Sequence, residues 1–107
     1  MQRLTREDVL ALDGLDDWRV LLHSMHAGFR TGTFEAGLEF ANRIGAVAEE
    51  AKHHPDLTIT YPKVCIELTT HDAGGLTDLD VDLARRVSSI AADLGYQADP
   101  VPDIHPS

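Results

Sequence analysis

The spacing of apolar residues changes twice between residues 34 and 94, and this limits the folds open to the chain. Residues 34–51 place apolar side chains three or four positions apart, which is the spacing of one helix face. Residues 56–69 alternate apolar and polar side chains around a Pro62-Lys63 turn, as the two strands of a hairpin do. Residues 79–94 return to helical spacing and stop before Gly95. The pattern predicts two long helices separated by an antiparallel hairpin.

Each predicted element has one apolar face. In the first helix the face consists of Gly37, Phe40, Ala41, Ile44, Val47, Ala48 and Ala51. In the hairpin it consists of Leu57, Ile59, Tyr61, Val64, Ile66 and Leu68. In the second helix it consists of Leu79, Leu83, Val87, Ile90, Ala91 and Leu94. Because glycine costs a helix interior about 1 kcal/mol relative to alanine, Gly37 and Gly45 predict close packing of the first helix on a sheet.

The first thirty residues complete the predicted sheet. Thr5 is a plausible N-cap and Gly14 a plausible stop for a short helix from Thr5 to Leu15. Residues 18–29 are rich in valine, leucine and aromatic residues, and predict two short strands around a turn at residues 23–25. The expected fold class is α+β: an antiparallel four-stranded sheet with helices packed on one face, in the order helix, two strands, helix, two strands, helix.

The length of 107 residues predicts one domain. Residues 1–96 are expected to form it. Residues 97–107 contain three prolines and no apolar period, so they predict a mobile C-terminal tail. His105 lies in that tail and is expected to take no part in chemistry.

Charge and cysteine content narrow the function classes. The net charge of -9 argues against general affinity for nucleic acid or anionic membranes, which requires a basic surface. The N-terminus lacks the apolar stretch of a signal peptide, and the single cysteine, Cys65, excludes an intrachain disulfide. We therefore expect a cytoplasmic protein, with Cys65 as a buried, inert thiol in a strand.

Histidines concentrate near the middle of the chain. His53 and His54 follow the first long helix, and His71 follows the hairpin eighteen residues after His53. Glu49 precedes His53 by four residues, so the two side chains are expected to share one side of the helix. Histidine gives and takes protons near neutral pH and also binds metals. The cluster therefore indicates either proton transfer or a metal site.

Simpler explanations exist for each of these residues. Histidines at a helix C-terminus commonly cap it, and a solvated Glu49 pairs only weakly with an imidazole. Thr77-x-x-Asp80 is a capping-box pattern, which gives Asp80 a structural role. Three imidazoles and a carboxylate could also hold zinc. However, adjacent His53 and His54 diverge as chelating groups, and neither H-E-x-x-H nor C-x-x-C occurs, so we expect no metal.

The ordered set of these residues resembles the signature of the pterin-4a-carbinolamine dehydratase family. It consists of Glu49, His53-His54-Pro55, Tyr61, His71 and Asp80. The resemblance covers most of the chain from about Trp18 to Leu94, including residues 70–77. Two positions depart from the family pattern: Leu57 stands where members usually carry tryptophan, and a phenylalanine of the family's Phe-rich run is replaced near Thr31.

The resemblance implies a fold, an activity and a site. The fold is two strands, helix, two strands, helix, preceded by an extra helix and assembled into homodimers or homotetramers through sheet edges and helices. The activity is dehydration of 4a-hydroxytetrahydrobiopterin to quinonoid dihydropterin, in pterin cofactor recycling beside an aromatic amino acid hydroxylase, without metal or organic cofactor. An alternative implied by the family is a non-catalytic dimerisation or assembly-chaperone module of the same fold.

The resemblance also implies roles for the site residues. His53 and His71 are the expected acid–base pair, in an order that the sequence leaves open. His54 is expected to position the pterin, and Glu49 to orient His53. Tyr61 and Asp80 are expected to bind the substrate, Asp80 in addition to its cap.

Overall fold

The computed structural model describes residues 2–99 and confirms the predicted α+β class. The elements follow in the order α1 (Arg6–Leu10), β1 (Arg19–Leu21), β2 (Ser24–Arg30), α2 (Phe34–Ala51), β3 (Asp56–Ile59), β4 (Lys63–Leu68), the 3-10 helix η1 (His71–Ala73), α3 (Asp78–Leu94) and β5 (Gln97–Ala98).

The sheet is antiparallel, with strand order β1-β2-β4-β3. The short strand β5 also pairs with β2, placing Ala98 opposite Phe29 and Gln97 opposite Arg30. The sheet therefore continues two residues into the segment that the sequence assigns to the tail. Residues 100–107 of that segment, including His105, lie outside the described residues.

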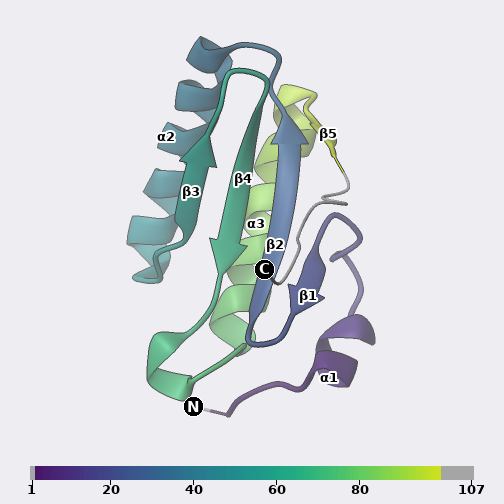
Figure 1. Ribbon diagram of the computed structural model, residues 1–107. Coiled ribbons are helices and arrows are strands. Elements are labelled where there is room, and N and C mark those ends of the chain that lie inside the picture. Colours follow the sequence, from purple (N-terminus) through teal and green to yellow (C-terminus); the bar gives the residue numbers. More distant parts are fainter. Residues whose placement is uncertain (1, 100–107) are drawn as a thin grey trace.

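Helices α2 and α3 pack side by side on one face of the sheet (Figure 1). Between them and the sheet, the ring of Phe40 makes edge contacts with Phe29 and Tyr96, at centroid distances of 5.6 and 5.4 Å. No helix of residues 2–99 covers the opposite face of the sheet (Figure 1). Cys65 lies on that face and is half-buried, rather than buried in the core as expected.

Only one of the two glycines of α2 lies where the helix packs closely on the sheet. A Cβ at Gly37 would lie 3.2 Å from Cγ2 of Ile59 and 3.3 Å from Cγ2 of Val64, so α2 approaches the hairpin most closely there. A Cβ at Gly45 would meet nothing within 4 Å. The predicted packing role is confirmed for Gly37 and wrong for Gly45.

The first helix is shorter than predicted. Thr5 caps α1 as expected, and its backbone and side-chain hydrogen bonds hold the pKa of Asp8 below its usual value. The helix ends at Leu10 rather than near Gly14, because Leu12 N–H bonds to the Val9 carbonyl and tightens the chain into a turn. None of the helices within residues 2–99 is long and apolar enough to cross a membrane.

Candidate functional site

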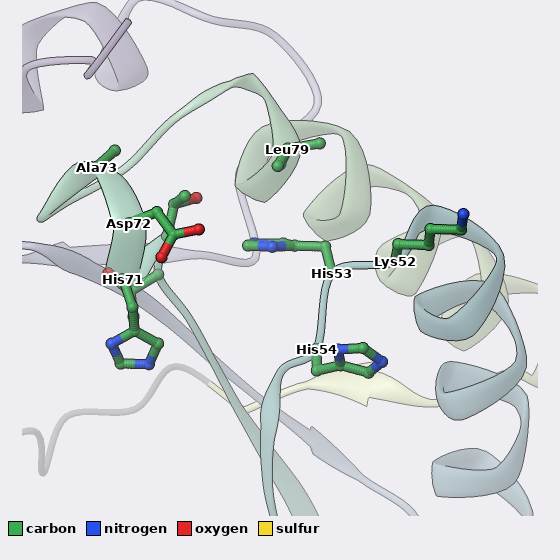
Figure 2. Close-up of a pocket in the computed structure, with 9 residues that line it drawn as sticks. Lys52, His53, His54, His71, Asp72, Ala73 and Leu79 are labelled. Atoms are coloured by element: carbon green, nitrogen blue, oxygen red, sulfur yellow. The ribbon is translucent and has the colours of Figure 1, made fainter. Parts of the chain in front are cut away.

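Three segments enclose a cavity at the end of the sheet where α2 stops. Residues 52–54 form one side and residues 69–73 the other, with Leu79 of α3 between them (Figure 2). The cavity volume is about 560 Å³. Sites for small molecules measure about 300–1,000 Å³, so a bicyclic heterocycle is within its capacity.

A left-handed residue turns His53 into this cavity. Lys52, the C-cap of α2, has φ 55°, and the next backbone N–H, that of His53, reaches back to the Ala48 carbonyl at 3.1 Å. This reversal ends the helix three residues before Pro55. As a result the His53 side chain points inward and is only 9 % exposed.

Asp80 fixes the orientation of His53. The Nε2 atom of His53 lies 2.6 Å from Oδ1 of Asp80, which is completely buried. The other carboxylate oxygen, Oδ2, accepts hydrogen bonds from the Thr70 hydroxyl at 2.7 Å and from the Thr77 N–H at 2.9 Å. The Thr77 contact belongs to the predicted capping box, which is confirmed. Asp80 therefore caps α3 and holds an imidazole with the same carboxylate.

The hydrogen-bond network assigns the tautomer of His53. A carboxylate only accepts, so Nε2 of His53 is the donor toward Asp80, and in a neutral imidazole this leaves Nδ1 as the acceptor. No buried side-chain nitrogen or oxygen within residues 2–99 lacks a hydrogen-bond partner. Since Nδ1 makes no hydrogen bond to the described chain, it is accessible from the cavity that His53 lines.

Glu49 pairs with His54 and not with His53, contrary to the predicted i,i+4 pair. The Glu49 carboxylate bonds to Nε2 of His54, and both side chains are mostly exposed. The left-handed conformation of Lys52 explains the difference, because it breaks the helical spacing and rotates His53 toward the core. The His54 ring is correspondingly turned toward the α2 side in Figure 2.

His71 faces the cavity from the opposite wall, and Tyr61 does not reach it. His71 begins η1 directly after β4 and is exposed (Figure 2). Tyr61 lies in the β3–β4 turn, at the other end of the hairpin, and is 69 % exposed. Leu57, the departure from the family's tryptophan, packs half-buried against the core and does not line the cavity either.

Thr70 is a further residue of the site, and the sequence pattern carries a signal for it. Thr70 continues the alternation of Val64, Ile66 and Leu68 and is buried like them. A threonine on the buried face of a strand needs a hydrogen-bond partner, and Asp80 provides it.

The three histidines do not form a chelate. His53 is held by Asp80 and His54 by Glu49, so their rings diverge. Within residues 2–99, no group of three or more histidine, cysteine, aspartate or glutamate side chains is arranged to hold a metal ion.

Comparison with known proteins finds similarity over most of the chain. Residues 2–90 match the family model described as pterin 4 alpha carbinolamine dehydratase. A protein of Sulfurisphaera tokodaii named "Putative pterin-4-alpha-carbinolamine dehydratase" is 36 % identical over 91 residues, which cover 84 % of this chain and 98 % of that protein. A protein of the same name from Thermosynechococcus vestitus is 40 % identical and covers 84 % and 96 % of the two chains.

A solved structure is similar as well. It is described as "Crystal structure of transcriptional coactivator/pterin dehydratase from Brucella Melitensis" and is 31 % identical in sequence, with a TM-score of 0.77. The match covers 84 % of this chain and 99 % of that one.

Proposed function

Because the chain belongs to the pterin 4 alpha carbinolamine dehydratase family, we propose that it dehydrates a 4a-hydroxytetrahydropterin in the cavity beside His53. In this reaction the 4a-hydroxyl leaves as water after gaining a proton, and N5 loses its proton. The product would be a quinonoid dihydropterin, and we propose that the reaction serves pterin cofactor recycling. One group must donate a proton and another must accept one, and each such transfer contributes typically 10²–10⁴-fold.

The hydrogen bond between His53 and Asp80 carries this proposal. A histidine with one nitrogen fixed by a buried carboxylate and the other facing a cavity is arranged as a general base. His53 would take the N5 proton through Nδ1, and the Asp80 carboxylate would stabilise the resulting imidazolium. His71, on the opposite wall, would protonate the departing hydroxyl.

His54 and Glu49 fit a supporting role. His54 lines the cavity, and Glu49 bonds to His54; both side chains are mostly exposed. His54 would position the pterin ring, with Glu49 orienting His54 rather than His53. An exposed ion pair of this kind contributes at most about 1 kcal/mol of interaction energy. We therefore expect the pair to affect pterin binding rather than proton transfer.

A stopped-flow assay tests the proposal. A hydroxylase generates the 4a-carbinolamine, and its decay to quinonoid dihydropterin is followed with the protein absent, present, and present with a chelator. We expect acceleration that survives the chelator, because the histidines supply protons without forming a chelate. A decay rate equal to that of the spontaneous reaction would overturn the enzymatic function, and loss of activity with chelator would indicate a metal site.

The similar Brucella protein, described as a transcriptional coactivator as well as a pterin dehydratase, favours one second candidate, a coactivator-like binding module. Such a module needs the fold and an interaction surface, but not the orientation of His53. If the stopped-flow assay shows no acceleration while the protein captures a specific partner protein, and His53→Ala does not weaken that capture, the binding module is the better description.

A further inference from the structure

The Thr70 side chain connects the two walls of the cavity that carry His53 and His71 (Figure 2). Thr70 follows β4 and directly precedes His71, with which η1 begins. Its hydroxyl donates to Oδ2 of Asp80 at 2.7 Å, and Oδ1 of the same carboxylate lies 2.6 Å from Nε2 of His53. Two hydrogen bonds and one peptide bond therefore link one histidine to the other.

Backbone hydrogen bonds make Thr70 the base of the loop that carries His71. The Thr70 N–H donates to the Gly75 carbonyl at 3.0 Å, and the Thr70 carbonyl accepts from the Gly75 N–H at 3.3 Å. The same carbonyl accepts from the Ala73 N–H at 3.1 Å. Residues 71–74 thus form a short loop closed at Thr70, which is itself buried. The direction of this loop depends on how Thr70 is held.

The hydroxyl of Thr70 has a defined direction. It has a single proton, and a carboxylate only accepts, so that proton lies in the bond to Asp80. The Thr77 hydroxyl, whose oxygen is 2.8 Å away, must then donate to the Thr70 oxygen. The completely buried Asp80 also accepts from the Thr77 N–H and from His53. Because hydrogen bonds in a chain strengthen one another, loss of the Thr70 donor would loosen the whole network.

We propose that Thr70 is a positioning residue that holds His53 and His71 at the mutual geometry needed for proton transfer. The inference rests on the proposed function. In that reaction one group takes the proton of N5 and the other protonates the hydroxyl on C4a, the carbon bonded to N5, so the two histidines must face adjacent atoms of one ring. Misplacement of such a group by about 1 Å costs up to about 10²-fold in rate. The Thr70 hydroxyl restrains His53 through Asp80, and the chain restrains His71 directly.

Two pairs of variants isolate the effect of the hydroxyl. Valine has nearly the shape of threonine without the hydroxyl, and alanine differs from serine only by that group. In the stopped-flow assay, Thr70→Val should lower kcat by about 10–100-fold and change KM by less than about threefold, because the hydroxyl acts through the histidines. Thr70→Ser should retain most of the wild-type kcat, and Thr70→Ala should lose as much as the valine variant. The serine and alanine variants decide the question if the valine variant does not fold.

A matched control removes a buried hydroxyl far from the cavity. Thr31 is buried, and its hydroxyl donates to the Thr33 carbonyl at 3.3 Å. Its N–H bonds to the Pro62 carbonyl in the β3–β4 turn, at the opposite end of the sheet. Thr31→Val should leave kcat unchanged even where it lowers Tm. Equal losses of kcat in Thr31→Val and Thr70→Val would show an effect of stability alone and overturn the inference, as would equal kcat in Thr70→Ser and Thr70→Ala.

The proton on Nε2 of His53 gives a measurement that does not depend on activity. Proton NMR should show it exchanging slowly with water in the wild-type protein, in Thr70→Ser and in Thr31→Val, because Asp80 is held in place in all three. In Thr70→Val and Thr70→Ala the exchange should be faster. Unchanged exchange in these two variants would overturn the inference while leaving the proposed function standing. Failure of the wild-type protein to accelerate the reaction would instead overturn the proposed function, and with it the role of Thr70.

Discussion

At the scale of single residues, Asp80 joins the fold to the chemistry. One oxygen of its buried carboxylate caps α3 and the other holds His53. The same hydrogen bonds that stabilise the helix terminus therefore set the direction of an imidazole. A substitution at Asp80 should affect both the stability of the protein and the orientation of the His53 imidazole, and the two effects can be measured separately.

Asp80→Asn should lower turnover by about 10²-fold or more while the protein stays folded. The amide still offers an oxygen to Thr77, but its NH₂ group favours the other tautomer of His53 and places the proton on the nitrogen that faces the cavity. The loss of stability should be about 1–3 kcal/mol by urea unfolding. Nitrogen chemical shifts of His53 would report the tautomer. Asp78→Asn, in the same helical turn but exposed, is the control. Equal losses of turnover in the two variants would show that Asp80 acts only as a helix cap.

The histidines should divide into two classes. His53→Ala and His71→Ala should each lower kcat by roughly 10²-fold, because each removes a proton-transfer group. His54→Ala should chiefly raise KM, and His105→Ala should change nothing. The double variant of His53 and His71 should lose less than the product of the single losses, because residues acting as a unit are non-additive. Small, equal losses at all four positions, or circular dichroism showing unfolding, would contradict this division.

Among the contacts of the candidate site residues, sequence predicted a contact set by local spacing better than one set by an unusual backbone conformation. The capping box of Thr77 and Asp80 was readable, since it depends only on local spacing. The pairing of Glu49 with His54 was not, because it depends on the left-handed conformation of Lys52, and lysine gives no signal for that conformation.

At the scale of elements, the left-handed conformation of Lys52 at the end of α2 sets the direction of the His53 side chain. Lys52→Gly should stabilise the protein by about 0.5–1 kcal/mol, because glycine adopts φ 55° without steric cost. Thermal or urea unfolding measures the gain. Lys52→Ala is the matched control, since it removes the same side chain but keeps the strain. A gain equal to that of glycine would show that the side chain, and not the backbone, is unfavourable.

The two glycines of α2 should respond to alanine with opposite signs. Gly45→Ala should add about 0.5–1 kcal/mol of stability, because the helix gains propensity and the new methyl meets no neighbour. Gly37→Ala should destabilise, since the new Cβ would press on methyl groups of Ile59 and Val64, which are anchored in adjacent strands. Urea unfolding of the two variants is the test. A gain at both positions would mean that the sheet moves away from α2 at little cost.

At the scale of the whole molecule, the sequence predicted the layers because periodicity changes with secondary structure. The long helices and the β3–β4 hairpin were readable in this way. The pairing of β5 with β2 was not predictable in this way, because a strand of two residues is too short to show a period. Its hydrogen bonds depend on where the chain lies after the end of α3. For Tyr61 the family pattern and the structure of the single chain disagree. The pattern assigns Tyr61 to the site, but within one chain Tyr61 lies at the far end of the hairpin.

We expect the protein to form a dimer or a larger assembly. A second copy of the chain could then bring Tyr61 close to a site. Within residues 2–99, β3 pairs only with β4, so its outer edge is open to another strand. Antiparallel pairing of two such edges about Thr58 would set Tyr61 opposite the partner subunit's Pro55, next to the partner subunit's His54. A core of this size also gains from added buried surface. Light scattering should give at least twice the 11.7 kDa chain mass.

Mixing two inactive or weakened variants tests whether Tyr61 acts across the dimer. A heterodimer of Tyr61→Ala with His53→Ala would have one site carrying both defects and one carrying neither. After unfolding and refolding together at equal amounts, such a mixture should regain about a quarter of wild-type activity, measured below KM, since half the dimers are mixed and each has one intact site. Each variant refolded alone is the control. Activity equal to the mean of the two controls would place Tyr61 in its own subunit's site or outside any site, and a mass near that of one chain would exclude the assembly itself.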